Sequence, residues 1–116
     1  METNERRVYQ RSKFDCDAKV SADGFAWKRI EVRDLSSGGL QMYLVDDYDI
    51  GAKLWFDLIL YGISTQFEVK VQGVVRRKDK TQHYHVYGIS FVDVPPDTKI
   101  RIDETIHKMR PKEFLI

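Results

Sequence analysis

The feature that most constrains this chain is a two-residue alternation of apolar and polar side chains between short turn signals. The alternation is clearest over residues 53–61, where the apolar members are Leu54, Phe56, Leu58 and Leu60. Successive side chains of a β-strand point to opposite faces, so such a segment buries one face and exposes the other. Similar patterns predict further strands over residues 14–20, 26–33, 40–45, 66–77 and 84–94. The sequence therefore predicts an all-strand body.

The predicted strands are separated by turn-forming segments, which favour antiparallel neighbours. Residues 22–24, Ala-Asp-Gly, have the composition of a hairpin turn, and residues 46–49 and 78–82 are charged turns. Gly73 interrupts the pattern of 66–77 and predicts a bulge or a sharp bend, as barrel corners need. We expect a mainly β fold, a small six-stranded antiparallel β-barrel.

One C-terminal helix is predicted over residues 97–109. Pro95 and Pro96 end the last strand, and Asp97 is a favourable N-cap residue. The apolar residues of this segment recur at helical spacing and are expected to pack on the mouth of the barrel: Ile102, Ile106 and Met109. The apolar tail, residues 114–116, is a candidate for docking on the body or on a partner.

We expect a single domain over residues 14–116, preceded by a flexible basic arm over residues 1–13. A chain of 116 residues can bury a core without disulfides. Residues 5–13 carry four basic side chains against one acidic side chain, whereas the formal charge of the whole chain is only +1. This near-neutral balance counts against a general binder of nucleic acid or of membrane surfaces. A local basic arm on a neutral body suits a small anionic ligand.

No arrangement of residues predicts a catalytic or a metal site. Cys16 is the only cysteine and is expected to be a packed or half-packed strand residue. His83 and His85 have no third ligand at metal-binding spacing, so these two and His107 are predicted to be surface histidines. We find no signal peptide and no apolar run of membrane-spanning length, so a cytoplasmic protein is the simplest expectation.

Two short motifs carry the chemistry of the chain. Arg7 and Arg11 lie in the basic arm, separated by three residues, and guanidinium groups grip phosphates bidentately or lie flat on a base. Asp34, Ser36 and Gly39 lie in the segment between two predicted strands, where a carboxylate can accept from N–H donors and a glycine lets a ligand approach the backbone. Each motif alone is more typical of a solvated arm or a plain turn. Together they favour a site for an anionic, purine-like ligand.

This motif pair resembles the signature of the PilZ domain family, Arg-x-x-x-Arg followed by Asp/Asn-x-Ser-x-x-Gly. The resemblance implies a six-stranded barrel with a terminal helix, acting as a bacterial receptor for cyclic di-GMP, with no enzymatic activity and no cofactor. It places Arg7 and Arg11 on the phosphates and guanines of the ligand. It places Asp34, Ser36 and Gly39 in the facing loop.

The resemblance also gives roles to neighbouring arginines. In the family, the residue before the first motif arginine influences whether one ligand or an intercalated pair is bound, and an arginine such as Arg6 is associated with the pair. Arg6 could equally face solvent. In some relatives a tryptophan near residues 76–77 stacks on a guanine, whereas this chain has Arg76 and Arg77. These two could stack in its place, although ordinary surface charges are the favoured interpretation.

Three functions are compatible with the sequence. The leading one is a cyclic di-GMP receptor or adaptor whose arm closes over the ligand and which signals to a protein partner, with no nucleic acid or membrane involved. The second is a PilZ-like adaptor that contacts proteins without any nucleotide, and the intact motifs argue against it. The third is a barrel for single-stranded nucleic acid, which needs an aromatic and basic face. The near-zero net charge counts against that function.

Overall fold

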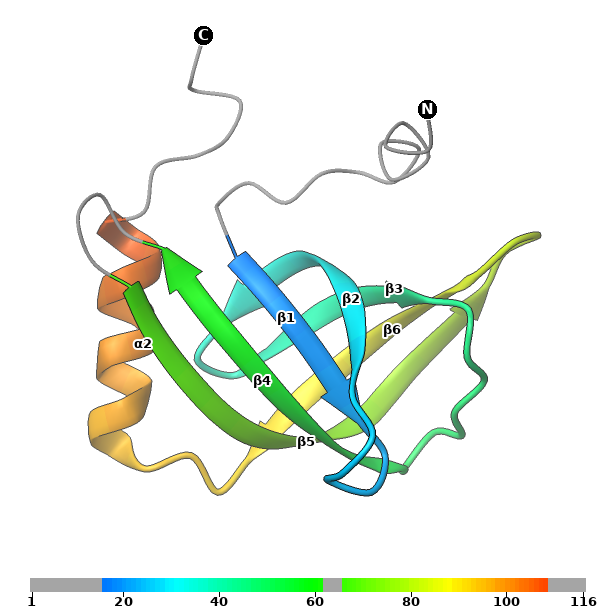
Figure 1. Cartoon of the computed structure of the whole chain (residues 1–116), viewed down its shortest axis with the longest axis horizontal. Coiled ribbons are helices and arrows are strands. Elements are labelled where there is room, and N and C mark those ends of the chain that lie inside the picture. The colour runs from blue at the N-terminus through cyan, green and yellow to red at the C-terminus, as the bar shows by residue number, and fades with distance from the viewer. Residues whose placement is uncertain (1–15, 62–65, 109–116) are drawn as a thin grey trace, which may run out of the picture.

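The computed structural model describes residues 16–61 and 66–108 of the chain (Figure 1). These residues form six strands and one helix: β1 (Cys16–Ser21), β2 (Lys28–Ser36), β3 (Gly39–Leu44), β4 (Lys53–Tyr61), β5 (Gln66–Lys80), β6 (His85–Val92) and α2 (Pro96–Lys108). The predicted arm, residues 1–13, and the apolar tail, residues 114–116, lie outside the described residues.

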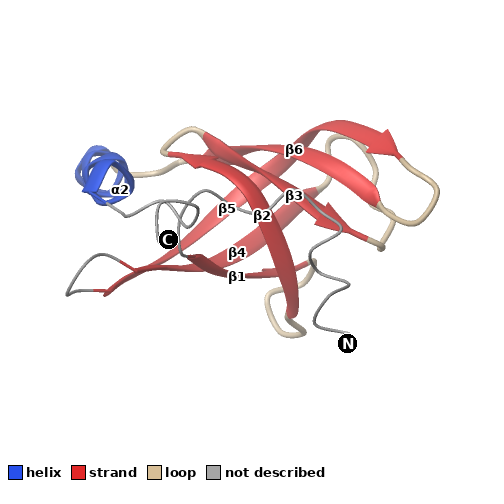
Figure 2. Cartoon of the chain, turned by 90° about the horizontal axis from the view of Figure 1, so that it is seen from above, coloured by secondary structure: helices blue, strands red, loops and turns tan. Residues whose placement is uncertain are grey.

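The strands close into a barrel in the order β1-β2-β3-β6-β5-β4. Every neighbouring pair is antiparallel, and β1 completes the closure by pairing with both β2 and β4. The predicted six-stranded antiparallel barrel is thus confirmed. Seen from above, β3 and β6 lie on the opposite side of the barrel from β1 and β4 (Figure 2).

The alternation located the strands well, and the differences lie at their ends. β4 has the predicted bounds, 53–61, and α2 is shifted by one residue from the predicted 97–109. β5 continues to Lys80, so the predicted charged turn over 78–82 is partly strand. The reversal lies at residues 81–84, where the Thr81 N–H and hydroxyl both donate to the Tyr84 carbonyl at 2.8 Å.

Of the bulge or sharp bend predicted at Gly73, the bulge is wrong. Gly73 pairs regularly with Leu54 and Phe91, and the register shift of β5 lies between Val75 and Arg77. Gly73 faces the interior, where a Cβ atom would lie 2.5 Å from Cγ2 of Ile89. The glycine therefore makes room for a neighbouring core side chain rather than for a bulge.

The inward-facing side chains of the strands fill the barrel, and α2 covers one end of it (Figure 1). Ile102 is completely buried and Ile106 is partly buried against the core, as the helical spacing predicted, whereas Met109 lies outside the described residues. The Arg101 guanidinium lies 4.1 Å from the centre of the Phe67 ring, which adds a cation–π contact between α2 and β5.

The loop from β3 to β4 is anchored by inward-facing residues of β6. The Tyr87 hydroxyl donates to the Asp46 carbonyl at 2.6 Å and accepts from the Tyr48 N–H at 2.8 Å. Burial raises the pKa of Tyr87, which keeps this hydroxyl protonated as a donor. The β3–β4 loop is therefore held by specific bonds.

His85 is not a surface histidine, in contrast to the sequence-based prediction. Its side chain lies on the inward-facing side of β6 and is buried, with Nδ1 3.2 Å from the Val45 carbonyl oxygen. The ring packs against Tyr87, at 5.6 Å between ring centres. Strand alternation puts His85, Tyr87 and Ile89 on one face, and only the barrel shows that this face is the interior. His83 and His107 are exposed, as predicted.

Within residues 16–61 and 66–108, no helix has the length and apolar character required to cross a membrane. Among the same residues, no group of three or more potential ligands could hold a metal ion. Cys16 is half-buried in β1, as expected.

Candidate functional site

The Asp34–Gly39 segment is a tight β-hairpin rather than the loop that the sequence suggested. Asp34 and Ser36 belong to the end of β2, Gly39 opens β3, and only residues 37 and 38 form the turn. Leu35 and Leu40 pair across the hairpin and are buried. Because these apolar residues point inward, the polar motif residues that alternate with them are directed to the outer face of the barrel.

The register places the motif in a row of residues across four strands. Asp34 pairs with Gln41, Gln41 pairs with Gly88, and Gly88 pairs with Arg77 of β5. A shallow hollow of about 570 Å³ lies over this row. Its lining includes the polar and glycine residues of the motif together with those of the facing strands: Asp34, Ser36, Gly38, Gly39, Gln41, Arg77 and Gly88. The structure thus brings together three predicted site residues, Asp34, Ser36 and Gly39, with one of the two additional arginines.

The two additional arginines are separated by the bulge in β5. The register shift between Val75 and Arg77 leaves Arg76 out of the regular pairing. Arg77 lines the hollow and Arg76 does not. Nε of Arg77 lies 3.2 Å from Oδ2 of Asp79. Both side chains are more than half exposed, so this ion pair holds Arg77 only weakly. Arg77 is thereby available to a ligand lying over β3 and β6.

Gly39 is required by the barrel itself. A Cβ atom there would lie 1.9 Å from the carbonyl oxygen of Ile89 on β6. Neither Gly38 nor Gly39 has a positive φ, so neither glycine is required here for a left-handed backbone conformation. Gly39 was expected to let a ligand approach the backbone. The close pairing of β3 with β6 requires a glycine at this position independently of any ligand.

Ser36 and Asp34 differ in how much of their hydrogen-bonding capacity the fold uses. The Ser36 hydroxyl accepts from the Gly38 N–H at 3.1 Å, which stabilises the turn and leaves its own proton to donate. Asp34 is exposed and makes no side-chain hydrogen bond or ion pair to the residues that the structure describes. Its carboxylate can therefore accept from the N–H donors of a ligand.

The turn of the hairpin is fastened to α2 by Asp103. The Ser37 N–H donates to one carboxylate oxygen of Asp103 at 3.1 Å, and the Ser37 hydroxyl donates to the other at 2.8 Å. These residues are 66 positions apart in the chain. The helix and the candidate site are therefore linked by two charge-assisted hydrogen bonds.

Replacing Asp103 with alanine should lower the free energy of unfolding by about 1 kcal/mol, because two exposed hydrogen bonds are lost. Thermal denaturation followed by circular dichroism measures this change. Glu104→Ala, one position along the same helix, is the matched control and should leave stability within about 0.5 kcal/mol. Equal stability of the two variants would show that Asp103 does not fasten the turn.

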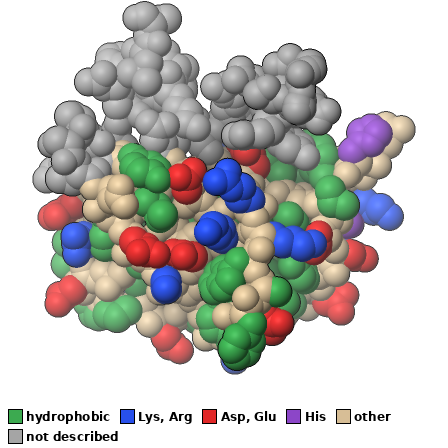
Figure 3. Space-filling view, in the orientation of Figure 1, with side chains coloured by type: hydrophobic (Ala, Val, Ile, Leu, Met, Phe, Trp, Pro, Cys, Tyr) green, Lys and Arg blue, Asp and Glu red, His purple; other side chains and the backbone are tan. Residues whose placement is uncertain are grey.

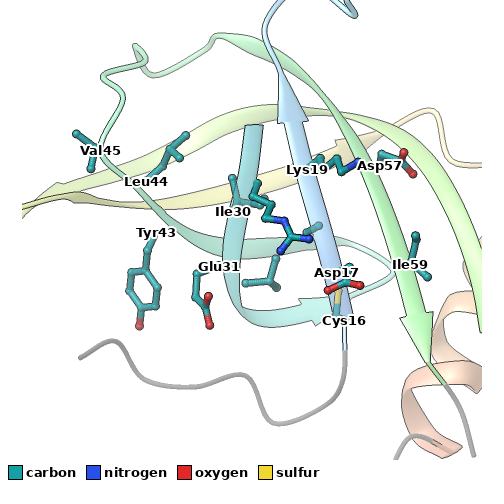
Figure 4. A pocket seen from close by; sticks show the side chains of 13 residues that line it. Cys16, Asp17, Lys19, Ile30, Glu31, Tyr43, Leu44, Val45, Asp57 and Ile59 are labelled. Atoms are coloured by element: carbon teal, nitrogen blue, oxygen red, sulfur yellow. The ribbon is translucent and has the colours of Figure 1, made fainter. Parts of the chain in front are cut away.

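A second hollow of about 500 Å³ lies where β1 and β2 separate (Figure 4). Charged side chains of both signs line it, among them Asp17, Lys19 and Glu31, and it contains no residue of the Asp34–Gly39 motif. The mixed charge gives no preference for an anion. We therefore place the candidate site at the first hollow, where the motif residues meet Arg77.

Three residues of the site region had not been singled out from the sequence. Gln41 lies two positions after Gly39 and therefore on the same face of β3, so the alternation could have identified it. Gly88 and Asp103 carried no such signal, because their proximity to the motif depends on the pairing of β6 and on the position of α2. The arginines of the predicted arm, Arg6, Arg7 and Arg11, lie outside the described residues.

Comparison with protein families decides what this barrel is. The family model described as the PilZ domain matches residues 5–108, a range that contains both sequence motifs. The chain belongs to the PilZ domain family. Among curated proteins, no sequence matches the chain.

The PilZ fold is also found in a solved structure. The Bacillus subtilis inhibitor of motility (MotI/DgrA) superimposes with a TM-score of 0.68 at 16% sequence identity. The match covers 85% of this chain and 51% of that protein, so the chain spans about half the length of its structural neighbour. This likeness establishes the common fold. PilZ domains are binding and adaptor modules, which agrees with a site made of a shallow hollow and exposed polar groups.

Proposed function

We propose that this PilZ domain is a cyclic di-GMP receptor that passes the signal to a protein partner. The observation that carries the proposal is the hollow over β3 and β6. Asp34 and Ser36 of β2 and Arg77 of β5 line this one hollow. The family match supports it, because the matched range includes Arg7 and Arg11 as well. No cofactor other than this ligand and no catalytic step form part of the proposal.

The proposed roles follow from the chemistry of guanine and phosphate. The N1–H and N2–H₂ edge of guanine donates, so Asp34 suits it as an acceptor. The O6 and N7 edge accepts from an arginine fork, and a guanidinium can also lie on the base, which gives Arg77 two ways to contribute. Arg7 and Arg11 would grip the phosphates, and Ser36 would donate one hydrogen bond.

The proposed mechanism is ordering of the basic arm on the ligand. Arg6, Arg7 and Arg11 would close over cyclic di-GMP against the β2–β3 hairpin and change the surface presented there. Since the hairpin turn is bonded to Asp103, the same event can reach α2. We further propose that the protein acts in the cytoplasm of a bacterium, where this messenger is made. A nucleotide-independent adaptor is the alternative.

Calorimetric titration with cyclic di-GMP tests the proposal and counts ligands. The domain should bind the dinucleotide in preference to GMP and cyclic GMP, because only the dinucleotide spans both arginines of the arm and the hairpin. We expect two ligands per chain, since an intercalated pair brings four phosphates that a third guanidinium, Arg6, helps to neutralise. Absence of binding heat at modest salt would favour the nucleotide-independent adaptor.

The variant Arg6→Leu should shift the stoichiometry towards one ligand while the far-ultraviolet circular dichroism spectrum stays unchanged. The shift follows because Arg7 and Arg11 suffice for the phosphates of a single ligand. A native stoichiometry of one, measured on protein with a verified active fraction, would contradict the role given to Arg6 and leave the receptor function intact.

Arg76 and Arg77 form a matched pair for testing the hollow. Arg77→Ala should weaken cyclic di-GMP binding by about tenfold, as expected for one charge-assisted bond of about 1.5 kcal/mol. Arg76→Ala removes the same charge from the adjacent position, outside the lining of the hollow, and should leave the affinity within about twofold. Equal losses in the two variants would show that net charge alone matters. Unchanged affinity in both variants would show that the ligand does not contact the arginines of β5.

A further inference from the structure

Three exposed aromatic side chains lie together at one end of the barrel, which we call the aromatic cap: Phe25, Trp27 and Trp55. Trp55 of β4 pairs with Ser21 of β1, and the continued β1–β2 register places Trp27 on the other side of Ser21. Phe25 is 87% exposed, and the tryptophans are 38% and 37% exposed. Figure 3 shows hydrophobic side chains at the lower edge of this face, over the ends of β1 and β4 and their adjoining loop.

The loop that carries Phe25 is held in one conformation by its own side chains. The Asp23 carboxylate accepts from the N–H groups of Phe25, at 2.8 Å, and of Ala26, at 3.0 Å. The Ser21 hydroxyl accepts from the Gly24 N–H at 2.8 Å, and Gly24 has a positive φ of 86°. An exposed phenylalanine on a pre-ordered turn loses little conformational freedom on binding, which is typical of an anchor residue in an interface.

Basic side chains border the aromatic cap along the outer face of β5, β4, β1 and β2. In the row of residues next to the cap, which we call the basic row, Lys70 pairs with Asp57, Asp57 with Lys19, and Lys19 with Arg29. Lys53 lies two positions before Trp55 and therefore on the same face of β4. The four basic residues are exposed, whereas Asp57 is half-buried. The border of the aromatic cap therefore favours an anionic partner.

We propose that the aromatic cap is a docking surface for an acidic segment of a protein partner, with an apolar residue of that segment packed against Phe25 and the tryptophans. The cap lies at β1 and β4, on the opposite side of the barrel from the hollow at β3 and β6 (Figure 2). A partner and cyclic di-GMP can therefore occupy the domain together. The docking surface does not depend on the proposed nucleotide site.

The charge at the tip of the loop argues for a protein rather than an anionic membrane. Asp23 is exposed beside Phe25, and its hydrogen bonds to the N–H groups of Ala26 and Phe25 lower the pKa of its carboxyl. The group stays ionised at neutral pH and would be carried into the headgroup layer if Phe25 inserted. The acidic segment of a protein can instead contact Lys53 and the basic row while avoiding Asp23.

Tryptophan fluorescence reports on the aromatic cap directly, because Trp27 and Trp55 are the only tryptophans of the chain. The probes are peptides selected from a random display library on the full chain. We expect selected peptides to combine acidic residues with an apolar one, and to shift the emission to shorter wavelength. Phe25→Ser and Lys53→Glu should each weaken binding at least tenfold and leave the affinity for cyclic di-GMP unchanged.

Two matched variants on α2 serve as controls, since Ile100 and Lys99 are also exposed apolar and basic residues. Ile100→Ser and Lys99→Glu should leave peptide binding unaltered. Selected peptides that lack acidic residues, or that bind Phe25→Ser as well as the native chain, would overturn the proposal. So would a Phe25-dependent emission shift with phosphatidylglycerol vesicles, which would indicate a membrane, or Phe25-dependent dimerisation in sedimentation, which would indicate a second copy.

Discussion

Replacing Arg7 or Arg11 with alanine is expected to lower the affinity for cyclic di-GMP by about one to two orders of magnitude. Each variant removes at least one charge-assisted hydrogen bond to a phosphate or a guanine, which contributes about 1.5–3 kcal/mol. The thermal stability of the barrel should stay within about 0.5 kcal/mol of the native value, as for most surface substitutions. Calorimetric titration and thermal denaturation of the same samples measure both quantities.

Arg33→Ala is the matched control for the arm arginines. Arg33 is exposed and immediately precedes Asp34, yet it is absent from the lining of the hollow. Its removal lowers the positive charge near the hairpin by the same amount and should change affinity by no more than about twofold at moderate salt. If Arg33→Ala weakened binding as much as Arg7→Ala, general electrostatic attraction would explain the result. A loss of fold in the arm variants would make those arginines structural.

Replacing Gly39 with alanine is expected to destabilise the protein by about 3 kcal/mol or more. The added Cβ would lie 1.9 Å from the Ile89 carbonyl oxygen. Since the obstacle is backbone of the paired strand, the clash can be relieved only by moving β3 from β6, at the upper end of overpacking costs. A loss of this size lowers the melting temperature by roughly 12 °C or more. Thermal denaturation followed by circular dichroism measures the change.

Gly38→Ala provides the comparison within the same motif. A Cβ atom at Gly38 would meet only the Ser36 hydroxyl oxygen, at 3.7 Å, and the backbone there has no positive φ. We expect this variant to retain native stability within about 0.5 kcal/mol. Equal melting temperatures for the two variants would contradict the packing explanation. If that explanation holds, loss of binding on substitution of Gly39 reports on the hairpin as much as on the ligand.

The close contact at Gly39 also affects which variants of the β2–β3 hairpin can test ligand binding. A larger residue such as valine at Gly39 would block ligand approach, but it would disturb the pairing of β3 with β6 first. Asp34→Ala tests the same surface without that complication, because the Asp34 side chain is exposed on the outer face and makes no hydrogen bond or ion pair to the described residues. A loss of cyclic di-GMP binding in Asp34→Ala at native stability would assign the hairpin to the ligand.

The sequence alone determined the strands, the barrel class, the terminal helix and the candidate motifs. Period-two alternation is a local property, so the Leu54–Leu60 pattern predicted β4 with its observed bounds. The proline pair and Asp97 located the start of α2 for the same reason. Asp34 and Ser36 were identified through residue types at fixed spacing, although the sequence placed them in a loop and only the structure places them in β2.

Only the tertiary structure decided which faces meet and what each glycine is for. Alternation assigns His85 to a face without saying that this face is the interior, and it suggested a bulge at Gly73, where the barrel needs space for Ile89. The selection of Arg77 over Arg76 depends on a bulge, and the contact of Ser37 with Asp103 joins residues 66 positions apart. These features arise from strand register and closure, which are set by packing across the whole barrel, and no local pattern of residues encodes them.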